Sequence, residues 1–197
     1  MDARSYFLSL HRHTHGEGSP TAQRVFNDAT PAQQRLKLPG HNTVAWNIWH
    51  IARGEDWGVN AMLRGKEQLL TRDNWNARLG MSRLDFGAGM TENEVADLSQ
   101  SIDLDGLKAY FIAVTAETRR FVETYDLDQL DEPIDVVSRL AQAPEAFTPG
   151  GDIVRSMVER LTTGRWFLTV MALYDVVLHV SEASHVLRLI APERRWA

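Results

Sequence analysis

Three polar residues interrupt an apolar stretch near the C-terminus, WFLTVMALYDVVLHVSEASHVLRLIA (residues 166–191). Asp175 and His179 are four residues apart, and Glu182 follows three residues later. A helix would place the first pair on one face, about 40° apart around its axis. Burying a carboxylate and an imidazole costs free energy unless something pairs with them. A divalent metal ion would do so, because two ligands one turn apart can reach one ion.

A third ligand must come from another element, and His50 is the best candidate. It lies midway along a second apolar segment, residues 43–64, on a face that also holds Trp46, Gly54 and Trp57. Gly54 would leave room beside the imidazole, and the two tryptophans would line a pocket. Two histidines and one carboxylate leave coordination positions open, as in catalytic rather than structural metal sites. The sequence therefore predicts metal ligands His50, Asp175 and His179.

Interpretations without a metal ion remain open for the same residues. A core histidine is usually only hydrogen bonded, and Asp175 with His179 could form a buried pair without an ion. Glu182 is predicted as the catalytic residue, a proton carrier beside the metal, although it could also orient His179, act as a fourth ligand, or pair with an arginine. His185 is close enough to Glu182 to be a spare ligand.

The remaining histidines give weaker signals. His11, His13 and His15 alternate, which would suit an extended metal clip, but a Gly/Ser/Pro-rich stretch follows them. We therefore expect a solvated N-terminal segment there. His41 follows a Pro-Gly turn and is expected near the surface or a helix cap.

Composition limits the class of protein. The 197 residues fit one domain, residues 1–197, and the formal net charge is −5 without any Lys/Arg-rich run, which argues against nucleic acid as a partner. There is no cysteine, so disulfides and thiolate ligands are excluded and a reducing cytoplasm is expected. The N-terminus has no signal-peptide core, and charged or polar residues interrupt every long apolar stretch, so no membrane association is expected.

Helical periodicity dominates the chain and predicts an all-α fold, a four-helix bundle with long connections and short extra helices. Long helices are expected at about 43–64, 104–125 and 165–191, with a first arm at 2–14 and short helices elsewhere, including 92–101 and 153–161. In the last helix, one seam is expected to face the core: Leu168, Met171, Ala172, Leu178, Val186 and Leu189. The connections at 66–90 and 126–151 show little periodicity and are the expected specificity elements.

Several segments resemble one family. NTVAWNIWHIARGEDWGVN resembles the metal-binding second helix of the DinB/YfiT-like superfamily of four-helix-bundle proteins, and ALYDVVLHVSEA resembles the family's stretch with two histidines four apart. GMTENEVADLS and LKAYFIAVTAETRRF resemble the middle of some members, so the likeness covers most of residues 40–191. On that match His50 is the first ligand and His179 the last, while Asp175 stands where the family normally has histidine.

The resemblance implies a divalent metal, commonly zinc or nickel, and frequent homodimers. Some members are transferases or isomerases that act with a low-molecular-weight bacterial thiol. An aspartate at position 175 would reduce the positive charge of the site and shift its preference toward iron or manganese. The sequence thus suggests a metal-dependent enzyme that activates water or a thiol cosubstrate for a small-molecule substrate. The alternative is a non-catalytic dimeric helical bundle, a stress or interaction protein with a degenerate metal site.

Overall fold

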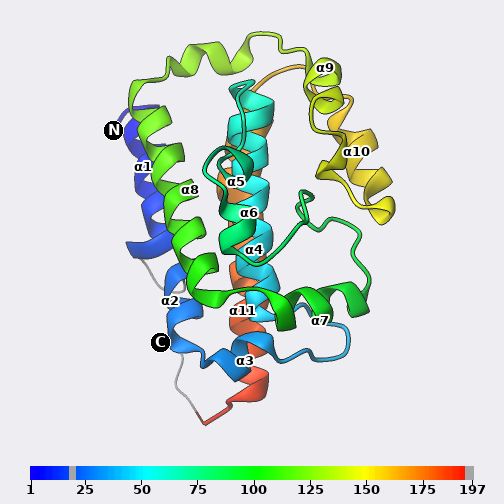
Figure 1. The fold of residues 1–197 in the computed structure, drawn as a ribbon. Helices are drawn as coiled ribbons and strands as arrows, with labels where there is room; N and C mark the ends of the chain where they lie inside the picture. The colour runs from blue at the N-terminus through cyan, green and yellow to red at the C-terminus, as the bar shows by residue number, and fades with distance from the viewer. Residues whose placement is uncertain (18–20, 194–197) are drawn as a thin grey trace.

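The computed structural model describes residues 1–17 and 21–193. Four long helical segments lie side by side and confirm the predicted all-α bundle (Figure 1). The first is α1 (Ala3–Arg12), which continues through a π turn, η1 (His13–Glu17). The others are α4 (Val44–Glu55) with its π-helical extension η2 (Asp56–Leu63), α8 (Leu104–Thr124), and η6 (Phe167–Tyr174) running into α11 (Asp175–Ile190). Among the described residues, an isolated bridge between Pro133 and Thr163 is the one β feature.

Shorter helices fill the connections. They are α2 (Ala22–Asp28), α3 (Pro31–Arg35), α5 (Leu69–Arg72), α6 (Trp75–Arg78), α7 (Glu92–Ser101), α9 (Val136–Ala141) and α10 (Asp152–Val158), with single 3₁₀ turns at Leu127–Asp131, Pro144–Ala146 and Pro149–Gly151. A capping box opens α7: Thr91 Oγ1 accepts from the Glu94 amide, and the Glu94 carboxylate accepts from the Thr91 amide. The connection at 66–90 contains α5 and α6, and the connection at 126–151 contains α9 and the three 3₁₀ turns. Both therefore contain more helix than their weak periodicity predicted.

Helix α4 is the centre of the molecule (Figure 1). All its residues are buried, as expected for a segment that is apolar on nearly every side. Thr43 starts the helix, because its hydroxyl accepts a hydrogen bond from the Trp46 amide at 2.9 Å. Gly65 follows the end of η2 with φ of +61°, a backbone conformation that glycine adopts without strain.

The last helix is rotated relative to the predicted seam. Leu178 and Leu189, expected inside, are 48% and 50% exposed, so that part of the prediction is wrong. The π-helical stretch η6 is the reason, because each π turn holds an extra residue and shifts every later side chain around the axis. The core face of α11 is instead formed by Val176, Val180, Ala183, Val186 and Leu187.

Two glycines let the central helix approach the last one. A Cβ built on Gly54 would lie 2.8 Å from Met171 Cε, and one on Gly58 would lie 2.7 Å from Met171 Cγ and 2.8 Å from its Cβ. All three distances are far shorter than ordinary van der Waals contacts. The spacing of Gly54 and Gly58 therefore sets how closely α4 and η2 pack on η6, and it also sets the distance between residues carried by the two helices.

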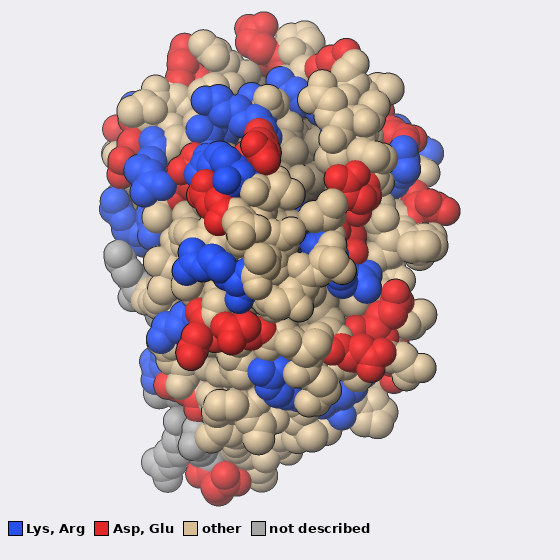
Figure 2. Space-filling view, viewed as in Figure 1, with Lys and Arg blue, Asp and Glu red and all other residues tan. Residues whose placement is uncertain are grey.

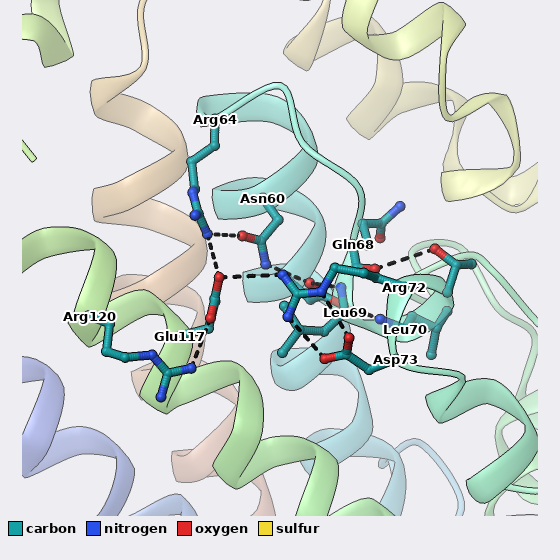
Figure 3. Close-up of polar contacts among 11 residues, drawn as sticks. Asn60, Arg64, Gln68, Leu69, Leu70, Arg72, Asp73, Glu117 and Arg120 are labelled. Atoms are coloured by element: carbon teal, nitrogen blue, oxygen red, sulfur yellow. Dashed lines mark hydrogen bonds and ion pairs between the residues drawn. The ribbon is translucent and has the colours of Figure 1, made fainter.

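A partly buried carboxylate joins α8 to the end of the central helix (Figure 3). Glu117 accepts hydrogen bonds from Arg64 and Arg120, each at 2.9 Å, and lies 3.5 Å from Arg72. Burial raises the pKa of Glu117, but its hydrogen bonds to Arg120 and Arg64 outweigh this and lower the pKa to about 2. This ion-pair cluster fixes η2, α5 and α8 relative to one another.

The segment Phe167–Ile190 is long and apolar enough to cross a membrane by length and composition alone. In this fold it packs along α4, and 44% of the most apolar window is buried. The core helix of a soluble protein passes the same test of length and composition. Lys/Arg and Asp/Glu side chains are interspersed over the face shown in Figure 2, without a stripe of one sign.

Candidate metal centre

The structure brings the predicted ligands together between α4 and α11. His50 Nε2 lies 3.4 Å from Asp175 Oδ2, and His179 Nε2 lies 3.6 Å from Asp175 Oδ1. One donor atom from each of the three residues lies within 4.8 Å of the other two. Three nitrogen and oxygen donors at such separations have the layout of a metal-binding triad, in which donors are about 3.3 Å apart around a tetrahedral ion.

His50 is held in place by the connection at 66–90. Its Nδ1 lies 2.5 Å from the Phe86 carbonyl oxygen, so Nδ1 carries the proton and donates it. Its ring stacks on Trp46 with 4.6 Å between centroids. Nε2 is therefore the ring nitrogen that faces Asp175, 3.4 Å from Oδ2. A histidine that ligates a metal typically donates its other N–H to a carbonyl in this way.

His179 is anchored by a side chain instead. Its Nδ1 lies 2.8 Å from Asn47 Oδ1, and Asn47 Nδ2 donates to the Thr43 carbonyl at 3.0 Å. The second hydrogen bond decides the orientation of the Asn47 amide, so its oxygen faces the imidazole and accepts the Nδ1 proton. His179 thus presents Nε2 to the centre, as His50 does.

Asp175 completes the triad from the first residue of α11. Among the described residues, no hydrogen-bond donor contacts its buried Oδ2. Burial raises the pKa of Asp175, but the neighbouring His50 and His179 outweigh this and hold it below its usual value. An ionised carboxylate with an unpartnered buried oxygen, facing two imidazole nitrogens, fits a divalent cation. Gly54 lies beside this carboxylate, and a Cβ built on it would be 3.7 Å from Oδ2, an ordinary van der Waals contact.

Glu182 lies beside the triad without entering it. Its carboxylate accepts from the Asn42 amide at 2.8 Å and from Asn42 Nδ2 at 3.1 Å, and it lies 3.6 Å from His179 Nδ1. Burial raises the pKa of Glu182, but hydrogen bonding to His179 and Asn42 prevails and lowers it to about 2. So low a pKa makes Glu182 a weak base at neutral pH. Its contacts connect α11 to the start of α4.

The two long connections meet beside His50. The Phe86 amide donates to the Ala146 carbonyl at 3.2 Å, and Thr148 Oγ1 donates to the Ala88 carbonyl at 2.5 Å. The Phe86 ring also packs against Phe147, with 5.2 Å between centroids. Residues 66–90 and 126–151 therefore form one continuous wall next to the candidate site.

Trp57, expected to line the pocket, instead packs against Phe86 and Phe147 of that wall. It is fully buried and stacks on Phe86 at 4.9 Å. Trp46 is the tryptophan that contacts the candidate ligands, because it stacks on His50 and meets the His179 ring edge-on at 5.6 Å.

Two of the three N-terminal histidines are buried, contrary to the sequence prediction of a solvated segment. His11 and His15 are 0% and 2% exposed and both contact Glu55, whereas His13 is exposed. The segment is helical rather than extended, so a spacing of four brings His11 and His15 to one face. His185 is exposed and pairs with His41 at 5.5 Å between ring centroids, away from the triad.

Comparison with known proteins agrees with this geometry. A family model described as the DinB superfamily matches residues 20–180. The chain belongs to the DinB superfamily. The match spans the whole of α4 and reaches past His179, so both halves of the candidate centre lie within the family region of this DinB chain.

A solved structure shares the fold of this DinB-superfamily chain. It is described as the crystal structure of the conserved protein of locus from Enterococcus faecalis, with a TM-score of 0.70 and 20% sequence identity, and the likeness covers 98% of this chain and 99% of that one. At that identity the likeness establishes the fold alone. No protein of curated function matches the chain.

Sequence reasoning missed the groups that orient the histidines. The Phe86 carbonyl carries no sequence signal, because every residue has one. Asn47 lies four residues from Thr43 and three from His50, but nothing in the pattern pairs it with His179. Glu55 contacts two buried histidines, and the sequence indicated this only weakly: Glu55 is a carboxylate within a segment that is apolar on nearly every side.

Proposed function

We propose that this DinB-superfamily chain is a metal-dependent enzyme whose divalent ion is bound by His50, Asp175 and His179. One observation carries the proposal: two imidazoles, each anchored through Nδ1, direct Nε2 toward the two oxygens of the Asp175 carboxylate, and Oδ2, which faces His50, is buried without a hydrogen-bond partner among the described residues. When bound, the ion would lower the pKa of a coordinated water or thiol.

The distances favour a metal over a purely hydrogen-bonded triad. The 3.4 and 3.6 Å that separate Asp175 from the two imidazole nitrogens are long for hydrogen bonds. They are close to the separation of about 3.3 Å between donors that share a tetrahedral ion. The non-catalytic alternative, a bundle with a degenerate site, would need this carboxylate to stay buried and ionised without a close partner.

The chain's own residues divide the remaining work. Side-chain exposures of 18% for Asp175 and 19% for His179 leave one side of the triad open to a substrate. Phe86 and Asn47 hold the imidazoles, and Glu182 fixes α11 against Asn42. We assign Glu182 a positioning role, and the wall formed by residues 66–90 and 126–151 the selection of a small-molecule substrate, with a low-molecular-weight thiol as cosubstrate.

The donor set bears on the identity of the ion. Two imidazoles and one carboxylate suit zinc, nickel, iron or manganese, and the carboxylate moves the preference toward iron or manganese relative to three histidines. The reaction class would be hydrolysis, or a transfer or isomerisation that uses the thiol.

Surface features support further parts of the proposal. Tyr174, Val177, Leu178 and Leu189 expose apolar area on the outer side of η6 and α11, which supports a homodimer through that face. Light scattering tests this dimer, because the variant Leu178→Asp is expected to be monomeric.

Two further features support the expected partners and location. The mixed charges on the face shown in Figure 2 give nucleic acid no basic stripe to bind. The lack of cysteine supports a cytoplasmic location.

Metal analysis of protein purified without an affinity tag tests the centre. We expect His50→Gln to contain about one equivalent less metal than the wild type, because three donors become two. The control is His185→Gln, an exposed histidine on α11 that should leave the metal content unchanged. Equal metal content in the wild type and His50→Gln would refute the site.

A thiol titration tests the chemistry. Cobalt-substituted protein should develop a thiolate-to-cobalt charge-transfer band when a low-molecular-weight thiol is added, and His50→Gln should not. An unchanged spectrum in the wild type would leave metal binding standing but remove the thiol-dependent reaction from the proposal.

A further inference from the structure

A second group of potential ligands lies between the N-terminal arm and the central helix. His11 in α1, His15 in η1 and Glu55 at the end of α4 form it, and we call it the N-terminal cluster. The exposed fractions are 0% for His11, 2% for His15 and 1% for Glu55. A carboxylate and two imidazoles so completely removed from water must neutralise one another or share a cation.

Both oxygens of the carboxylate are used. His11 Nε2 lies 3.0 Å from Glu55 Oε1, and His15 Nε2 lies 2.8 Å from Glu55 Oε2. These are ordinary hydrogen-bond lengths, so without an ion the carboxylate pairs with both rings. One ligand atom from each of the three residues also lies within 4.8 Å of the other two, so the same groups can bind one divalent ion in place of these hydrogen bonds.

His15 is held in place through Nδ1. That nitrogen lies 2.7 Å from the His11 carbonyl oxygen and 2.9 Å from Thr14 Oγ1. The ring is thereby oriented so that Nε2 faces Glu55 Oε2, 2.8 Å away. The Nδ1-to-carbonyl anchor is the arrangement that His50 makes with Phe86.

The two imidazole rings of the N-terminal cluster lie against each other. The rings of His11 and His15 stack at 3.8 Å between centroids, 14° from parallel. Two imidazolium rings so close and so deeply buried would repel each other. Among the described residues, His11 Nδ1 has no hydrogen-bond partner, so hydrogen bonding does not fix the tautomer of that ring and its Nε2 can act as a ligand. One divalent cation would satisfy both rings and the carboxylate at once.

We propose that His11, His15 and Glu55 form a second divalent-metal site, structural rather than catalytic, that binds zinc and fastens the N-terminal arm to α4. The two sites differ in access: the His50 triad is partly open, whereas every ligand of the N-terminal cluster is buried. A surface pocket lies against one of the three ligands, His15. This proposal does not depend on the function proposed for the other site.

The experiment isolates the second site. In the double variant His50→Gln/His179→Gln, which lacks two ligands of the first site, cobalt and then zinc are titrated into metal-free protein, and bound metal is counted after gel filtration. We expect about one equivalent per chain. Adding His15→Gln or His11→Gln should reduce this below about a tenth of an equivalent. The matched control His13→Gln, an exposed neighbour, should retain the full equivalent.

Two readouts do not require the ligand variants to fold. Zinc at about 100 times its dissociation constant should raise the thermal midpoint of the double variant by about 5–10 °C. Imidazole nitrogen NMR should show metal-induced shifts at Nε2 of His11 and His15. A double variant that binds no metal, or whose binding survives His15→Gln in folded protein, overturns the proposal. Shifts at other histidines would overturn it as well.

Discussion

His50 and Asp175 face each other from two different helices, with 3.4 Å between Nε2 and Oδ2. The position of each residue depends on contacts with other parts of the chain as well as on its own helix. The Phe86 carbonyl holds the His50 ring, and the close approach of α4 and η6 at Gly54 and Gly58 brings Asp175 within reach. The predictions below separate the ligands, the groups that position them and the packing that brings them together.

The first prediction concerns Asp175, the proposed ligand that stands where the family resemblance implies a histidine. Asp175→Asn removes the negative charge and one strong donor, so we expect the affinity of the His50 site for divalent metal to fall at least about tenfold. Asp175→His should still bind metal but prefer zinc more strongly over manganese, because a nitrogen replaces a hard oxygen. Competition with a chromogenic chelator measures both. Asp152→Asn, an exposed carboxylate in α10, serves as control and should change neither value.

The second prediction concerns Asn47, which accepts the Nδ1 proton of His179. Asn47→Ala leaves the ligands in place but frees the imidazole to rotate, so we expect a loss of about 10–100-fold in metal affinity. Asn47→Asp keeps an acceptor and should recover part of it. Asn93→Ala, in an exposed position of α7, is the control. If Asn47→Ala binds metal as tightly as the wild type, the anchoring role is wrong.

The third prediction concerns helix packing. Gly58→Ala would place a methyl group against Cβ and Cγ of Met171, which cannot swing away, and overpacking of this kind costs about 1–3 kcal/mol. The better helix propensity of alanine offsets up to about 1 kcal/mol. Gly54→Ala meets only the flexible end of Met171 and should cost less. Urea unfolding of the metal-free proteins gives the free energies.

A double variant checks the cause of the packing effect. Met171→Ala removes Cγ, the nearer of the two atoms that the new methyl group would meet, and keeps Cβ. Gly58→Ala should therefore cost less in that background than in the wild type, although the contact with Cβ remains. Additive costs would show that Met171 Cγ is not the obstacle.

The fourth prediction is a pH dependence. The pKa of Glu117 is lowered from its ordinary 4.5 to about 2 in the folded protein. A depressed carboxyl pKa adds stability above the unfolded value and loses it as the pH falls through the folded one. We expect Glu117→Gln to reduce the free energy of unfolding by about 1–2 kcal/mol at pH 7. The difference from the wild type should shrink between pH 4.5 and pH 2.

Glu123→Gln is the control for this prediction, because Glu123 is exposed on the same helix. Its effect on stability should be small at every pH. A stability difference between Glu117→Gln and the wild type that stays constant down to pH 2 would contradict the assigned origin.

Sequence alone determined much of this protein, because local periodicity reports which face of a helix is apolar. It determined the all-α bundle, the buried central helix with His50, and the spacing of Asp175 and His179. The DinB resemblance rested on the same residues, and the family match confirms it. These features depend on residues close together in the chain, where side-chain direction follows directly from helical geometry.

Tertiary structure decided the rest, because it depends on contacts between distant residues. Periodicity predicted Leu178 inside, but the π turns of η6 moved it to the surface. Only folding joined Asn47 to His179, the Phe86 carbonyl to His50, and Glu55 to two histidines some 40 residues away. A backbone carbonyl has no sequence signature, and a buried charge reveals its partners only when the helices that carry them are packed together.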